Sequence, residues 1–298
     1  MKAQVKKPCL VLEGGGVKCA YQYGVLMQLE ESGLLPDFGG VSGTSFGALN
    51  AALYISGGVE RLAGFWERIS PTVMFHEPKL EKLADRIYAG EKVLDLPTVL
   101  FVLSQWRNSS KKHREVSDQY REVVMDNVDE AAIRASDMDF GLVTVEIPGL
   151  NDILNMTTRE LMGNYLKAKN VPGAFGIKVK ELTVEDIDFG MLPLFVAASA
   201  NYAAFNPLKI GDTYFIDGGI YDNIPIAMME RRGYSKFLCI RTNCPAPKKR
   251  WSNAAEVTYI TPSEELGSCA LFSRDNIRSL IALGRSDALS QLDALKTF

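Results

Sequence analysis

The feature that most constrains the fold is a serine placed between two glycines, in the run Gly43-Thr44-Ser45-Phe46-Gly47. A short apolar stretch precedes this run, and small, helix-compatible residues follow it at once. A G-x-S-x-G sequence between a strand and a helix is typical of a nucleophile elbow, a sharp turn that exposes the serine hydroxyl. Glycines on both sides permit a close backbone approach that a Cβ would prevent. The run predicts Ser45 as a nucleophile at a helix N-terminus, and an ordinary glycine turn is the alternative.

A second glycine-rich turn lies near the N-terminus. A short apolar strand leads into Gly14, Gly15 and Gly16, and the apolar spacing of residues 19–31 predicts a helix. Bare backbone N–H groups ahead of a helix can hold a phosphate or the oxyanion of an acyl-transfer intermediate. A dinucleotide-binding turn would need a smaller residue than Cys19, and no G-K-[ST] follows as in a P-loop. These residues alone leave an oxyanion hole, a nucleotide site and a tight turn open.

The third segment is an apolar strand that ends in Asp217, with Gly218 and Gly219 directly after it. Such a sequence is often only a turn. Both histidines of the chain, His76 and His113, precede this aspartate. The Ser…Asp…His order of α/β-hydrolases therefore cannot be realised with it as the acid. If the serine of the elbow is a nucleophile, we expect its base to be an aspartate at a strand end.

These three segments, in this order, resemble the patatin-like phospholipases, in which a serine and an aspartate form a catalytic dyad. The resemblance rests on the runs GGGVKC, GVSGTSFGALNAAL and VAASANYAAFNPLKIGDTYFIDGGIYDNIPI. It covers roughly residues 8–57 and 190–295, with Cys19 standing where the family usually has glycine. By this resemblance, Ser45 attacks an acyl carbonyl and Asp217 accepts the serine's proton.

The resemblance also implies roles for the neighbouring residues. The glycine loop of Gly14, Gly15 and Gly16 would form the oxyanion hole, with the N–H groups of the last two as donors. Lys18 would approach an anionic group of the substrate, and an exposed lysine of the first helical turn is the alternative. An aspartate with a reference pKa near 3.9 is a weak base, so the scheme requires a dry site with preorganised donors. The expected site also includes the glycines of the elbow and of the turn after the aspartate: Gly43, Gly47, Gly218 and Gly219.

Strand–helix alternation at both ends of the chain predicts an α/β fold with a mainly parallel central sheet and helices on both faces. We expect a single domain over residues 1–298, in the three-layer arrangement of the family. It would contain the glycine loop and elbow (8–57), a helical insertion or lid after the nucleophile helix (about 58–135) and the aspartate segment with C-terminal helices (190–298). The apolar stretch 96–106 predicts either a core helix or a helix that rests on a membrane surface or covers an acyl-chain pocket.

Composition sets further expectations. A net charge of −3 gives no general attraction to nucleic acid. Five cysteines without a C-x-x-C pair predict reduced thiols, and no cluster has metal-ligand spacing, so no metal or cofactor is expected. The apolar runs are too short for a secretory signal or a membrane-spanning helix. We therefore expect a cytoplasmic protein with transient contact at membrane surfaces, and the oligomeric state stays open.

Together, the residues and the resemblance predict a lipid acyl hydrolase that cleaves carboxylic esters through a Ser45–Asp217 dyad and an acyl-enzyme intermediate. A short-chain carboxylesterase or thioesterase with the same dyad is the nearest alternative. A non-catalytic regulator that binds lipids or nucleotides through the glycine loops is the alternative of another class.

Overall fold

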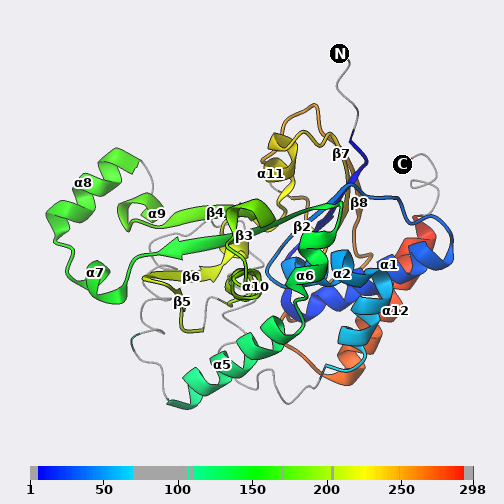
Figure 1. The fold of residues 1–298 in the computed structure, drawn as a ribbon, viewed down its shortest axis with the longest axis horizontal. Coiled ribbons are helices and arrows are strands. Elements are labelled where there is room, and N and C mark those ends of the chain that lie inside the picture. The colour runs from blue at the N-terminus through cyan, green and yellow to red at the C-terminus, as the bar shows by residue number, and fades with distance from the viewer. Residues whose placement is uncertain are drawn as a thin grey trace.

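A mixed β-sheet forms the centre of the fold (Figure 1). The computed structural model describes residues 6–69, 107, 111–168, 171–202, 205–247, 249–291 and 298. Within these residues the sheet has eight strands: β1 (Cys9–Leu12), β2 (Gly40–Thr44), β3 (Asp139–Ile147), β4 (Lys178–Thr183), β5 (Leu208–Ile210), β6 (Thr213–Asp217), β7 (Lys236–Ile240) and β8 (Glu256–Ile260). Neighbours among β3, β2, β1, β7 and β8 run parallel, whereas β4, β6 and β5 pair antiparallel. The prediction of a mainly parallel sheet is confirmed.

Helices cover both faces of this sheet (Figure 1). The helices that matter most for the two faces are α1 (Cys19–Glu31), α2 (Phe46–Trp66), α11 (Ile226–Arg231) and α12 (Arg274–Ser290). Side chains of a strand alternate between faces, and Leu10 and Leu12 pack into the core that contains residues of α1, α2 and α12. Cys9 and Val11 pack into a second core with residues of α11. The predicted three-layer α/β arrangement is confirmed.

The remaining helices extend from these layers. They are α5 (Lys111–Asp126), α6 (Glu130–Ala135), α7 (Leu150–Leu154), α8 (Thr158–Ala168), α9 (Val171–Ala174) and α10 (Leu192–Ser199). The predicted insertion falls only partly on described residues, since 70–106, with His76 and the apolar stretch 96–106, lie outside them. The insertion thus stays a prediction. Among the described helices none is both long and apolar enough to span a bilayer.

Two strands meet end to end along one edge of β3. β2 pairs in parallel with β3 up to Val143, and β6 pairs antiparallel with β3 from Thr144 onward. β4 occupies the opposite edge of β3 over residues 141–146. Because β2 and β6 run in opposite directions along the same edge, their C-terminal ends face each other beside Val143 and Thr144. We call this point the strand junction.

Candidate active site

Ser45 and Asp217 meet at the strand junction. Ser45 directly follows the last residue of β2, and Asp217 is the last residue of β6. The Ser45 Oγ donates a hydrogen bond of 2.6 Å to Asp217 Oδ2. The side chains are buried, with Ser45 5% and Asp217 1% exposed. The other carboxylate oxygen, Oδ1, accepts the N–H of Gly219 at 2.7 Å, which fixes the carboxylate plane. A serine hydroxyl that donates to a buried carboxylate is an arrangement that a nucleophile and a general base would require.

The backbone of Ser45 has an unusual conformation. Its φ is 58° and its ψ is −134°, and among the described residues no other non-glycine residue has a positive φ. Such a conformation costs about 1–3 kcal/mol and persists only where its surroundings impose it. A Cβ at Gly43 would lie 2.2 Å from the Gly47 carbonyl oxygen, and one at Gly47 would lie 2.2 Å from that of Leu12. The elbow therefore requires both glycines, and it places Ser45 at the N-terminal, positive end of α2.

The glycine loop is fixed through the peptide between Gly14 and Gly15. The Gly14 carbonyl oxygen accepts from Thr242 Oγ1 at 2.7 Å and from Asn223 Nδ2 at 2.9 Å. In a trans peptide the N–H points opposite to the carbonyl, and the described chain has no cis peptide bond. The Gly15 N–H therefore points away from Thr242. Neither this N–H nor that of Gly16 makes a hydrogen bond within the described part of the chain, whereas the Gly14 N–H donates to the Asn223 carbonyl at 3.2 Å.

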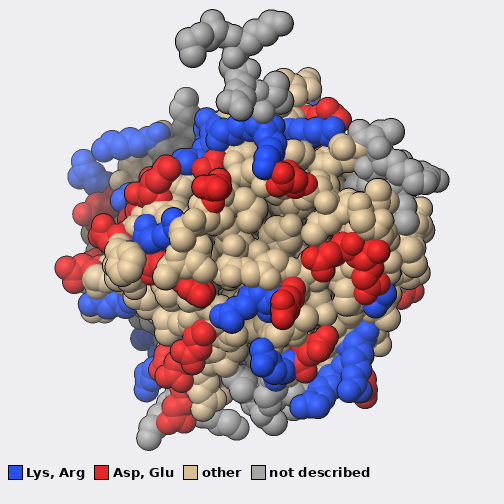
Figure 2. All heavy atoms as spheres, turned by 45° about the vertical axis from the view of Figure 1, so that its right-hand side comes forward, with Lys and Arg blue, Asp and Glu red and all other residues tan. Residues whose placement is uncertain are grey.

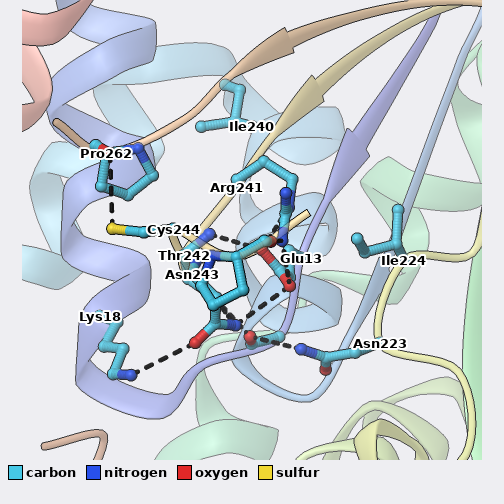
Figure 3. Close-up of polar contacts among 12 residues, drawn as sticks. Glu13, Lys18, Asn223, Ile224, Ile240, Arg241, Thr242, Asn243, Cys244 and Pro262 are labelled. Atoms are coloured by element: carbon cyan, nitrogen blue, oxygen red, sulfur yellow. Dashed lines mark hydrogen bonds and ion pairs between the residues drawn. The ribbon is translucent and has the colours of Figure 1, made fainter. Parts of the chain in front are cut away.

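A buried ion pair holds the base of the loop (Figure 3). Glu13 Oε2 accepts from Arg241 Nε at 2.9 Å and from the Thr242 N–H at 2.7 Å. Glu13 Oε1 accepts from Asn243 Nδ2 at 3.0 Å. The side chains of Arg241 and Glu13 are 4% and 5% exposed. These contacts connect the end of β1 to the end of β7 just before the glycine loop. Removing one partner of a buried ion pair typically costs about 3–5 kcal/mol of stability.

A cavity lies beside Ser45 and Asp217. Gly16 forms part of its wall with a φ of 57°, and a Cβ there would lie 2.2 Å from the Cys269 carbonyl oxygen. Aromatic rings of Phe46, Tyr120 and Phe272 pack around the cavity. The ring centroid of Phe46 lies 5.8 Å from that of Tyr120 and 5.5 Å from that of Phe272. The lining residues are Gly16, Ser45, Phe46, Tyr120, Tyr202, Asp217, Cys269, Ala270 and Phe272. A mainly apolar wall around a few polar groups is typical of a small-molecule site.

The structure brings together some of the predicted site residues and not others. Ser45, Asp217 and Gly16 all line the cavity. Gly218 lies at the strand junction, where a Cβ would meet the Val143 carbonyl oxygen at 2.2 Å. Lys18 is not one of the described lining residues, and its Nζ instead donates to an oxygen of Asn243 at 3.4 Å (Figure 3).

Sequence patterns did not single out most of the cavity wall. Tyr120 comes from α5, Tyr202 follows α10, and residues 269–272 precede α12. Tyr120 lies in a polar, charged stretch of the sequence, and Tyr202 and residues 269–272 carry no catalytic motif of their own, so nothing local to these residues marked them as part of a site. Of the two histidines of the sequence, His113 lies in the described part of the chain, where its backbone belongs to α5.

Asp222 is a further buried carboxyl group, and its backbone carbonyl oxygen accepts from Thr44 Oγ1 at 2.9 Å beside the elbow. Its side chain is 5% exposed and its Oδ1 accepts the N–H of Ile224 at 3.1 Å. Burial raises the pKa of Asp222 from its ordinary value of 3.8 to about 6. Because the folded-state pKa is raised, the stability that this group contributes is complete below pH 3.8 and is lost as the pH rises through about 6.

We therefore expect Asp222→Asn to remove that loss. The free energy of unfolding of the variant, relative to the parent, should increase between pH 4 and pH 7 by up to about 3 kcal/mol, at 1.36 kcal/mol per pKa unit. Urea denaturation at the two pH values measures this difference. Parallel pH profiles of parent and variant would show that Asp222 ionises as readily in the folded chain as in the unfolded one.

The sequence matches a known protein family over most of its length. The sequence model of the family described as patatin-like phospholipase matches residues 10–229, which include the glycine loop, the elbow and Asp217. A search of curated proteins gave no match.

Solved structures with a similar fold include the following three chains. VipD from Legionella pneumophila is similar at a TM-score of 0.51 and 12% identity, over 97% of this chain and 67% of VipD. The type III effector protein ExoU gives a TM-score of 0.41 at 14% identity, over 97% of this chain and 54% of ExoU. Full-length ExoU in complex with SpcU, from the type III secretion system of Pseudomonas aeruginosa, gives 0.35 at 14% identity, over 98% and 53%. The chain thus spans about two thirds of VipD and about half of ExoU.

Proposed function

Because the chain belongs to the patatin-like phospholipase family, we propose that it hydrolyses carboxylic ester bonds of lipids with Ser45 as nucleophile and Asp217 as proton acceptor. The observation that carries this proposal is the hydrogen bond of 2.6 Å from Ser45 Oγ to Asp217 Oδ2. The position of this hydrogen bond beside a mainly apolar cavity supports an acyl substrate.

In the proposed acylation step, Asp217 Oδ2 takes the hydroxyl proton of Ser45 as Oγ bonds to the carbonyl carbon of the ester. The carbonyl oxygen becomes an oxyanion, which the N–H groups of Gly15 and Gly16 are free to stabilise. We leave Gly14 out of this role, since its N–H already donates to the Asn223 carbonyl. Asp217 then returns the proton to the leaving alcohol as the carbon–oxygen bond breaks, and an acyl group remains on the serine.

In the proposed deacylation step, Asp217 accepts a proton from water as the water oxygen attacks the acyl carbon. The tetrahedral intermediate expels Ser45 Oγ, which regains the proton from the carboxyl group. A carboxylate is a weak base in water because its reference pKa is near 3.9. The N-terminus of α2 at Ser45 favours the anionic intermediates. This interaction is stronger because both side chains are buried and water is excluded around them.

The mainly apolar lining of the cavity favours an acyl chain over a strongly charged ligand. On the face drawn in Figure 2, acidic and basic side chains are interspersed around a broad area without charged groups. Such a mixture creates no large field of one sign that would attract nucleic acid. We keep Lys18 as the proposed contact for an anionic substrate group, and cytoplasmic location with transient membrane-surface contact as parts of this proposal.

Fluorophosphonate labelling followed by hydrolysis of a lipid extract tests the proposed function. We expect one adduct, located at Ser45 by peptide mass spectrometry, and release of fatty acid from the extract. A panel of esters and thioesters with short and long acyl chains separates a lipase from a small esterase or thioesterase, because only a lipase gains rate with chain length. Saturable binding of adenosine nucleotides without any adduct at Ser45 would instead favour the non-catalytic regulator.

A further inference from the structure

One short segment at the end of α10 holds the backbones of both dyad residues. This segment, which we call the 199–201 segment, consists of Ser199, Ala200 and Asn201. The Ser45 N–H donates to Ser199 Oγ at 3.0 Å. The Asp217 N–H donates to the Asn201 carbonyl oxygen at 2.9 Å. The three residues of the segment are fully buried, so these hydrogen bonds are shielded from water.

The Ser199 hydroxyl occupies a particular place at the strand junction. Besides accepting from the Ser45 N–H, it donates to the Val143 carbonyl oxygen at 2.6 Å. Thr44, the last residue of β2, is paired with Val143 in the parallel ladder. The hydroxyl thus stands between β3 and the first residue beyond β2. It lets Ser45 leave the sheet with a φ of 58° while its N–H stays satisfied.

The 199–201 segment is itself fixed from two sides. From α5, Tyr120 Oη donates to the Ala200 carbonyl oxygen at 2.5 Å, and Arg121 Nε donates to Asn201 Oδ1 at 3.1 Å. On the other side, Asn201 Nδ2 donates to the Phe215 carbonyl oxygen in β6 at 3.3 Å. The segment therefore joins α5, β6 and the elbow in one buried hydrogen-bond network, and such a network restricts the relative motion of its members.

We propose that Ser199 is a positioning residue for the nucleophile: its hydroxyl holds the Ser45 backbone in the strained conformation that presents Oγ to Asp217. This inference rests on the proposed function. Ser199 is not one of the described residues that line the cavity, so it acts through the Ser45 backbone and not on substrate. Its loss should therefore lower kcat and leave KM unchanged.

The test compares Ser199→Ala with the parent in hydrolysis of a soluble p-nitrophenyl ester and in the rate of fluorophosphonate labelling. We expect kcat and the labelling rate to fall by about 10²-fold, the scale of a displacement of about 1 Å at a reacting group, with KM within about twofold of the parent. Ser42→Ala is the matched control. Ser42 is also fully buried, and its Oγ donates to the Pro225 carbonyl oxygen at 3.4 Å, away from the nucleophile. The control should keep the parental kcat.

A second variant covers the case in which Ser199→Ala does not fold. Ser199→Cys keeps the shape of the side chain, but a thiol is a weak hydrogen-bond acceptor, so kcat should again fall with KM unchanged. Parental kcat in either folded Ser199 variant would overturn the inference, as would equal losses of kcat in Ser199→Ala and Ser42→Ala. If the parent itself neither reacts with the fluorophosphonate nor hydrolyses the ester, the proposed function fails and takes this inference with it. A reactive parent with an equally reactive Ser199 variant overturns this inference alone.

Discussion

Ser45→Ala will lower kcat/KM for ester hydrolysis by at least about 10⁴-fold, the scale at which serine hydrolases respond to loss of the nucleophile. The substitution removes the atom that would form the acyl-enzyme bond. It leaves the elbow intact, because alanine meets the same backbone restriction as serine at a φ of 58°. The variant should therefore keep the parental Tm and show no fluorophosphonate adduct in intact-protein mass spectrometry.

The histidines provide the control for this prediction. His76→Ala and His113→Ala should each retain activity within about tenfold of the parent, because neither residue transfers the proton in a serine–aspartate mechanism. A folded histidine variant that loses about 10⁴-fold, the scale of a missing triad member, would restore a histidine-dependent mechanism. Undiminished turnover in Ser45→Ala would rule out the hydrolytic mechanism altogether.

Asp217→Asn has the second largest expected effect. The amide keeps the shape of the side chain and an oxygen that can accept the Gly219 N–H, which is bound at 2.7 Å in the parent. It cannot take a proton from Ser45 Oγ, so kcat should fall by at least about 10²-fold, the lower range for loss of a general base. The labelling rate should fall with it, since the fluorophosphonate also needs an activated hydroxyl. Steady-state hydrolysis and the time course of labelling measure the two effects.

Asp222→Asn is the matched control for Asp217→Asn, because it makes the same chemical change in a buried carboxyl five positions later in the chain. The Asp222 side chain accepts the N–H of Ile224 and supports the start of α11. We expect the Asp222 variant to stay within about tenfold of parental activity. If Asp217→Asn is active while Asp222→Asn is folded but inactive, the general base is Asp222 and the assignment to Asp217 is wrong.

Features that depend on neighbouring residues could be predicted from the sequence. The short apolar run before Gly14 predicted β1 and the apolar spacing of residues 19–31 predicted α1, because such patterns are local properties of strands and helices. The elbow was predictable for the same reason, since its glycines contact backbone within a few residues of Ser45 or in the adjacent strand.

The meeting of the two dyad residues was decided by tertiary structure. Ser45 and Asp217 are 172 positions apart, and nothing local to either residue requires them to touch. They meet because β2 and β6 approach from opposite directions along the same edge of β3, which depends on strand pairing and register. The resemblance to a family predicted the pair, and the strand junction supplies the physical reason.

The sequence by itself determined the fold class, the elbow and the glycine loop, because each is encoded by a local pattern of glycines and apolar residues. Only the tertiary structure decided which groups surround them. Thr242 bonds to the Gly14 carbonyl oxygen, Ser199 accepts the Ser45 N–H, and Cys269, Ala270 and Phe272 line the cavity. Each of these contacts joins segments that are distant in the chain. Their partners are set by how β3, β7 and the helices pack, and no short run of residues records that packing.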